Sequence, residues 1–143
     1  MATAPLPHGY AEDYRPHNDE PFMNGRQLAY FRAKLIAWKE ELLQGAEEAL
    51  GNLREDSFRD PDVIDRATSV ADWSLELRAR DRQRKLIGKI EAALRRIEEG
   101  EYGYCEVTGE PISLARLEAR LVATMTVDAQ ERHERRERSF REK

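Results

Sequence analysis

Apolar residues repeat at helical spacing through the first half of the chain. From Gln27 to about Leu53 they are first separated by alternating steps of three and four residues, the spacing of a coiled-coil seam. These positions are Leu28, Phe31, Leu35, Trp38 and Leu42. Around Gly45 the seam shifts to a second set, Leu43, Ala46, Leu50 and Leu53. The pattern predicts one long helix with a local change of register.

The start of this helix carries a capping signal. Asn24 is a good N-cap, and Gln27 three residues later completes a capping-box pattern. Residues 1–22 show no periodicity and are expected to form an extended or partly disordered arm. Phe22 and Met23 are expected to dock on the first helix.

A second long helix follows a break in the pattern. Pro61 disfavours helix at Asp60 and suits a first helical position, so the first helix is expected to end before residues 55–62 and the second to begin near Pro61 or Asp62. The second helix runs to about Glu99, with Gly100 as C-cap. Its expected seam positions are Trp73, Leu77, Leu86, Ile90, Ala93 and Ile97.

Two helices of this length joined by a short turn predict an antiparallel hairpin about 50 Å long at 1.5 Å per residue. The alternative is a compact helical bundle, for which the rest of the chain offers only one more helix. We expect a mostly α fold, with a coiled-coil hairpin, a small degenerate zinc-knuckle region and a C-terminal helix. The expected divisions are an arm (1–22), the hairpin (23–99, tip near 57–68) and the knuckle with its helix (100–143).

Residues 100–126 differ in character from the hairpin. Close glycines and alternating aromatics predict short strands or a tight knuckle. Residues 113–120 suit a short helix, and residues 127–143 suit a final one whose charges match the helix dipole.

Cys105 lies where half of a zinc knuckle would be. A structural zinc site needs four ligands, as in two CxxC pairs. Thr108 occupies the second position, and Thr126 and Ala129 keep the spacing of the other pair without sulfur. Threonine is a poor zinc ligand and alanine is none. We therefore expect a knuckle without metal, in which Cys105 is a buried residue.

Two carboxylates, Asp62 and Asp65, lie at the expected tip of the hairpin. If the second helix has begun, they are one turn apart and share a face. Because they are expected to be exposed at the end of a long helical hairpin, these carboxylates could act on a partner. An equally weighted alternative is that they are acids favoured at any helix N-terminus.

Charge and composition restrict the function classes. The net charge of −4 argues against binding DNA through a general basic excess. Between Arg78 and Arg96, however, eight bases stand against two acids. The N-terminus lacks a signal-peptide h-region and no window suits a membrane span, so we expect a soluble, cytoplasmic protein.

Several segments together resemble the DksA family of bacterial transcription factors over about residues 22–130. These segments are MNGRQLAYFRAKLIAWKEEL, DPDVIDRA, WSLELRARDRQRKLIGKIEAALRRIEEGEYGYCEVTGEPI and RLEAR. The resemblance implies a regulator, not an enzyme, that binds RNA polymerase directly rather than DNA and inserts the hairpin tip into the secondary channel. The family's DxxDxA tip motif falls on Asp62, Asp65 and Ala67, and Arg82 matches the surface that meets the channel rim.

The resemblance also implies a response to the alarmone ppGpp at ribosomal RNA and biosynthetic promoters. The matching ppGpp positions are Leu86, Lys89, Arg120 and Gln130, the last usually a lysine. The chain resembles cysteine-poor members, so we expect no zinc, no other cofactor and a monomer. Two alternatives are a cleavage factor of the Gre class and a structural coiled-coil adaptor.

Overall fold

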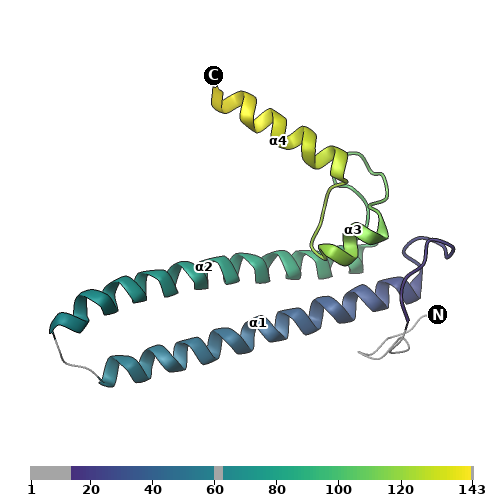
Figure 1. The fold of residues 1–143 in the computed structure, drawn as a ribbon. Helices are drawn as coiled ribbons and strands as arrows, with labels where there is room; N and C mark the ends of the chain where they lie inside the picture. Colours follow the sequence, from purple (N-terminus) through teal and green to yellow (C-terminus); the bar gives the residue numbers. More distant parts are fainter. Residues whose placement is uncertain (1–13, 60–62, 143) are drawn as a thin grey trace. The chain divides into compact units, whose positions relative to one another are not determined.

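The computed structural model describes residues 14–59 and 63–142, excluding the side chains of residues 49, 52–59, 63–69 and 142. The described backbone forms helices and turns without a strand. The helices are α1 (Gly25–Arg59), α2 (Val63–Glu99), α3 (Leu114–Ala119) and α4 (Val127–Glu142) (Figure 1). The mostly α fold is therefore confirmed. None of the described helices is long and apolar enough to cross a membrane.

The chain divides into two compact units. The first joins Met1–Leu35 to Ala92–Lys143, and the second is Ile36–Glu91. The second unit is thus made of the C-terminal part of α1 and the N-terminal part of α2, which run antiparallel (Figure 1). The division into arm, hairpin and knuckle drawn from the sequence stays a prediction.

The N-cap of α1 is confirmed, but the capping box closes differently. The side-chain oxygen of Asn24 accepts a hydrogen bond from the Gln27 N–H at 2.9 Å. The Gln27 side chain does not return to Asn24. It accepts from the Met23 N–H at 2.8 Å and donates to the backbone of His17. Gln27 is fully buried, so one side chain fixes both the helix start and the segment before it.

The predicted end of α1 near Leu53 is wrong, because the helix continues to Arg59. The residues after Leu53 are compatible with helix. The only strong breaker is Pro61, which restricts the residue just before it. The end of α2 is as predicted. Gly100 has φ 76°, and the N–H of Glu101 donates to the Arg96 carbonyl at 2.8 Å, which closes a Schellman motif.

The core of the first unit is an aromatic and aliphatic cluster. Tyr30, Phe31 and Leu35 from α1 are at most 1% exposed. Phe31 contacts Tyr102 with ring centroids 5.7 Å apart, and the Tyr102 hydroxyl donates to the Leu121 carbonyl at 2.8 Å. The other large buried side chains in this unit include Ile112 and Leu117. These contacts pack the knuckle onto the base of α1.

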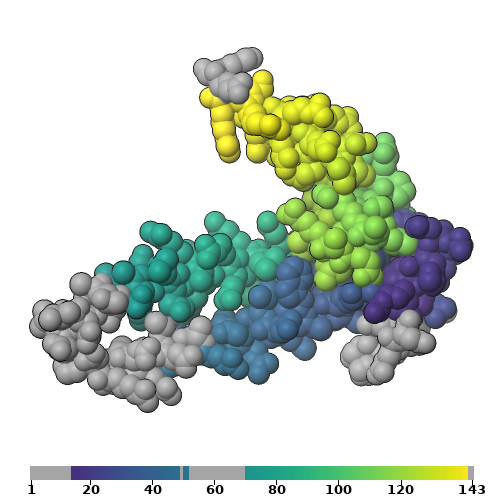
Figure 2. Space-filling view, in the orientation of Figure 1, coloured from purple at the N-terminus to yellow at the C-terminus, as the bar shows by residue number. Residues whose placement is uncertain are grey.

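Phe22 and Met23 pack on the knuckle, and their expected docking on the first helix stays a prediction. The Phe22 ring meets Tyr104 edge-on with centroids 5.3 Å apart. The Met23 side chain lies directly over Gly103, which has no Cβ to obstruct it. Figure 2 shows this N-terminal segment, in purple, against the green knuckle residues of the same unit. The segment before α1 therefore closes the knuckle.

The predicted seam of the second unit is only partly correct. Ile90 is fully buried and Leu86 half-buried, but Trp73 and Leu77 are 46% and 42% exposed. Leu77 precedes Leu86 by nine residues, or two and a half turns, which places them on opposite faces. The seam continues instead through half-buried Gln83 and Ala79.

Candidate functional site

The acidic tip is described only in part, through the backbone of Asp65 and Ala67. Asp62 lies outside the described residues. Asp65 and Ala67 are the third and fifth residues of α2, and their side chains are not among those described. Because α2 begins at Val63, Asp65 lies in the first turn, where a carboxylate is favoured by the helix dipole. The role of these residues stays a prediction.

A basic face extends along α2 toward its middle. Arg82 belongs to a set separated by steps of four, three and four residues, which places the set on one side of the helix. All four side chains are exposed, and the ion pairs found in the described part of the chain involve none of them. The basic face consists of Arg78, Arg82, Lys85 and Lys89. It presents four uncompensated positive charges to solvent.

The four expected ppGpp positions fall in different units. Leu86 and Lys89 lie in the second unit, half-buried and exposed respectively. Arg120 and Gln130 lie in the first. The Arg120 N–H donates to the Arg116 carbonyl at 2.7 Å, and the Gln130 side chain donates to Glu134 at 3.1 Å. The assignment of a ligand site to these residues stays a prediction.

The knuckle brings together the positions that match zinc ligands. Cys105 is 3% exposed. Burial disfavours its thiolate. Hydrogen bonds from the Thr108 hydroxyl and amide, and from the amides of Thr126 and Val107, outweigh burial and lower the pKa of Cys105 from 9.0 to about 6. The Thr126 hydroxyl also accepts from the Ala129 N–H at 3.2 Å, and Ala129 is buried. The knuckle is therefore organised by hydrogen bonds to the sulfur of a single cysteine.

These four side chains do not fit a zinc ion. Thr108 and Thr126 are engaged in the hydrogen bonds around the sulfur and at the start of α4, and Ala129 has no donor atom. Among the side chains that the structure describes, no group of three or more His, Cys, Asp or Glu could hold a metal ion. Amide and hydroxyl donors take the place that a cation has in a four-cysteine knuckle.

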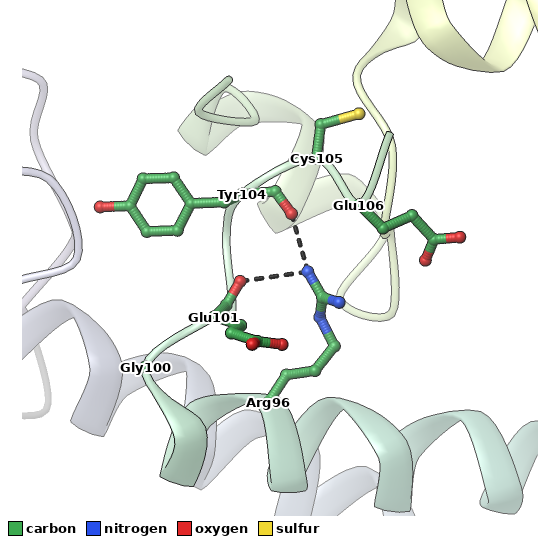
Figure 3. Close-up of a pocket in the computed structure, with 6 residues that line it drawn as sticks. All are labelled: Arg96, Gly100, Glu101, Tyr104, Cys105 and Glu106. Atoms are coloured by element: carbon green, nitrogen blue, oxygen red, sulfur yellow. Dashed lines mark hydrogen bonds between the residues drawn. The ribbon is translucent and has the colours of Figure 1, made fainter. Parts of the chain in front are cut away.

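Arg96 clips the end of α2 to the knuckle, a contact that the sequence did not reveal. Its Nη2 donates to the Tyr104 carbonyl at 2.7 Å and to the Glu101 carbonyl at 3.1 Å (Figure 3). Its guanidinium points into an open hollow of about 400 Å³, also lined by Gly100, Cys105 and Glu106. Within the basic run Arg96 looks like its neighbours, so only the fold distinguishes it as structural.

A second missed contact ties α1 to α3. Lys34 lies 3.3 Å from the Glu118 carboxylate and 5.0 Å from the centre of the Tyr30 ring. The hydrogen bond to Tyr30 and the pair with Glu118 raise the pKa of Lys34, although burial opposes this. In the sequence these residues are 84 positions apart, and nothing in the charge pattern pairs them.

We expect that chelation leaves the thermal midpoint of this protein unchanged, because a knuckle predicted to hold no zinc has no metal to lose. The informative comparison is a variant with Thr108→Cys, Thr126→Cys and Ala129→Cys. If the four positions converge as described, it binds one zinc ion, and its midpoint rises by roughly 5 °C or more with zinc and falls with chelator. Calorimetric melting with and without EDTA measures both. A fall in the midpoint of the natural chain on chelation would contradict the expectation.

The comparisons with known proteins cover most of the chain. Two family models match, "DnaK suppressor protein DksA, N-terminal domain" over residues 27–97 and "Prokaryotic dksA/traR C4-type zinc finger" over residues 100–135. A relative from Caulobacter vibrioides (strain NA1000 / CB15N), named RNA polymerase-binding transcription factor DksA, is 64% identical over 130 residues, covering 91% of this chain and 92% of its own.

More distant relatives agree. The protein of the same name from Escherichia coli (strain K12) is 41% identical over 129 residues, covering 90% of this chain and 85% of its own. The solved structure of transcription factor DksA2 from Pseudomonas aeruginosa matches with a TM-score of 0.77 and 41% identity. It covers 82% of this chain and 90% of that one.

Proposed function

The chain belongs to the DksA family, and from this premise we propose that it regulates transcription by binding RNA polymerase directly. The observation that carries the proposal is the 64% identity, over 91% of the chain, with a protein named for that activity. The protein acts as a regulator and not as an enzyme. A cytoplasmic location, a monomeric state and the lack of sequence-specific DNA binding stay predictions.

The proposed working end is the tip of the hairpin, where α2 begins. The hairpin enters the secondary channel of the polymerase and carries Asp62, Asp65 and Ala67 toward the active site. There the tip destabilises promoter open complexes. Support comes from the position of the motif at the start of α2, where a helix of 35 residues is followed by one of 37. A lever of this length can reach a buried catalytic centre from the surface of a large enzyme.

The basic face of α2 is proposed to meet the rim of the channel. Arg82 and its neighbours Arg78 and Lys85 are exposed on one side of the helix. An arginine at an exposed position binds a carboxylate in two-pronged geometry and steers association through its charge. Polymerase binding that weakens as salt is added would support this role, since screening weakens exposed pairs.

The experiment that tests the proposed function is capture of RNA polymerase core by the tagged full chain, followed by lifetimes of open complexes at a ribosomal RNA promoter. Direct capture and shortened lifetimes are expected. Capture with unchanged lifetimes would leave only an adaptor role. Cleavage of the transcript in a backtracked complex would favour a Gre-like factor instead.

The response to ppGpp is proposed to be weaker than with a lysine at position 130. We expect Gln130→Lys to raise the apparent affinity for ppGpp, measured through its effect on open-complex lifetime, roughly tenfold. The reason is that a charge-assisted bond to a phosphate contributes about 1–3 kcal/mol. Titration of ppGpp against promoter lifetime measures it. Glu131→Gln is a useful control, since it also raises the local charge by one unit, at the exposed residue next to position 130. Equal responses of the two variants would contradict a specific site.

A further inference from the structure

Two glycines lie inside the long helices of the second unit at nearly the same level, Gly45 in α1 and Gly88 in α2. An ion pair between Lys39 and Glu91, with Nζ and Oε2 3.2 Å apart, shows where the two helices face each other. Gly45 follows Lys39 by six residues. Gly88 precedes Glu91 by three, so both glycines lie on the tip side of the pair. At 1.5 Å per residue they are about 4.5 Å apart along the hairpin, less than one helical turn.

Packing does not require glycine at either position. Nothing lies within 4 Å of an ideal Cβ on Gly45 or Gly88, so an alanine would fit at both. Neither has the positive φ that favours glycine at Gly100. Glycine is nevertheless a poor residue inside a helix, because its backbone has more freedom to lose when the helix forms. These two glycines therefore supply backbone freedom rather than space.

Side-chain packing in the second unit does not compensate for these two weak points. Of the side chains described in that unit, only Ile90 is buried. Toward the tip the seam of α2 continues through Gln83 and Ala79, a polar and a small residue. On α1 the half-buried residue next to Gly45 is Ala46, which is also small. Few buried apolar contacts mark the parts of a protein that open locally, so the helices here depend mostly on their own backbone hydrogen bonds.

We propose that Gly45 and Gly88 form a hinge in the hairpin, at which the part that carries the tip bends relative to the part that ends at Glu91. A pair of packed helices bends only where both yield, because an intact helix acts as a splint for its neighbour. Two glycines less than one turn apart meet this condition. Gly51 does not, since the residue level with it on α2 is Ala79, a good helix former.

A bend at this hinge moves the tip over a large distance. Asp65 precedes Gly88 by 23 residues, which is about 35 Å of helix. A bend of ~20°, the lower limit of a sharp kink, displaces the start of α2 by about 12 Å. The core side chains of the first unit lie outside residues 36–91, so the bend leaves them in place. The hinge is a property of the free chain and does not rest on the proposed function.

The test measures the distance between two spin labels by double electron–electron resonance in the full chain. The labels replace Glu40 and Asp72, which are exposed and lie on opposite sides of the hinge. They are attached through p-acetylphenylalanine, so that Cys105 stays unmodified. The natural sequence is expected to give a broad distribution of distances. Gly88→Ala alone narrows it roughly twofold, and adding Gly45→Ala changes it little further, because one stiff helix already acts as a splint.

Gly51→Ala is the matched control. It makes the same gain in helix propensity at a third glycine with open space around its Cβ, but no glycine lies opposite, so the distribution stays as broad as in the natural sequence. Three results would overturn the proposal. The first is a natural distribution as narrow as that of Gly88→Ala, and the second is equal narrowing by Gly51→Ala. The third is a distribution that stays broad when both hinge glycines are replaced, which would place the motion elsewhere in the hairpin.

Discussion

We expect Asp65→Asn to abolish the shortening of open-complex lifetimes while leaving capture of RNA polymerase within about twofold of the natural chain. The substitution preserves shape and removes one charge at the tip. Binding is expected to depend on the length of α2 beyond the tip, whereas the effect on the promoter complex depends on the tip carboxylates. Competition binding and a promoter-lifetime assay on the same preparation measure the two quantities separately.

Asp72→Asn is the matched control for this variant. Asp72 follows Asp65 by seven residues, which places it on the same face of α2 two turns from the tip, and it is exposed. Loss of the favourable dipole interaction at Asp65 costs about 0.3–1 kcal/mol at most, so thermal melts of both variants should resemble that of the natural chain. Equal promoter activity of the two variants would refute a special role for the tip.

The helices could be predicted because their signals are local. Asn24, Pro61 and Gly100 each mark an end by backbone chemistry that acts within a few residues. The sequence places the end of α1 too early because the polar residues after Leu53 also suit a loop, although the segment carries no helix breaker of its own. A charged segment with no glycine or proline remains a good helix former.

The seam was predicted well only where burial is deep. Leu86 and Ile90 are in phase, and the structure buries Ile90 completely. Trp73 and Leu77 are four residues apart, as two seam positions should be. Leu77 and Leu86, however, are nine residues apart, which places them on opposite faces of the helix. Apolar character alone suggested a core position, but it equally suits a surface for a partner.

The candidate site depended on resemblance more than on pattern. Charge spacing could propose Asp62 and Asp65, but no physical rule would select Ala67. Conversely, Arg96 and Met23 have structural roles that neither pattern nor resemblance indicated, because each acts through a backbone group brought near by the fold. Contacts to carbonyls and glycines leave no mark in a single sequence.

The contact between Met23 and Gly103 leads to the largest expected loss of stability. Gly103 has φ 91°, which side chains rarely adopt, and a Cβ there would lie 2.9 Å from Cγ of Met23 and 3.0 Å from its Sδ. We expect Gly103→Ala to lower the free energy of unfolding of the first unit by about 2–4 kcal/mol, through backbone strain and displacement of Met23. The corresponding fall in midpoint is roughly 5–15 °C.

Gly109→Ala separates the two causes. Gly109 also has a positive φ, 76°, but nothing lies within 4 Å of its ideal Cβ, so that variant incurs backbone strain alone. Near-UV circular dichroism of the tyrosines reports on the first unit, and fluorescence of Trp38 and Trp73 reports on the second. Equal midpoints for Gly103→Ala and Gly109→Ala would show that displacing the Met23 side chain has no measurable cost in stability. A larger fall for Gly103→Ala, confined to the tyrosine signal and partly relieved by Met23→Ala, would show that this side chain and the glycine beneath it lock the segment before α1 onto the knuckle.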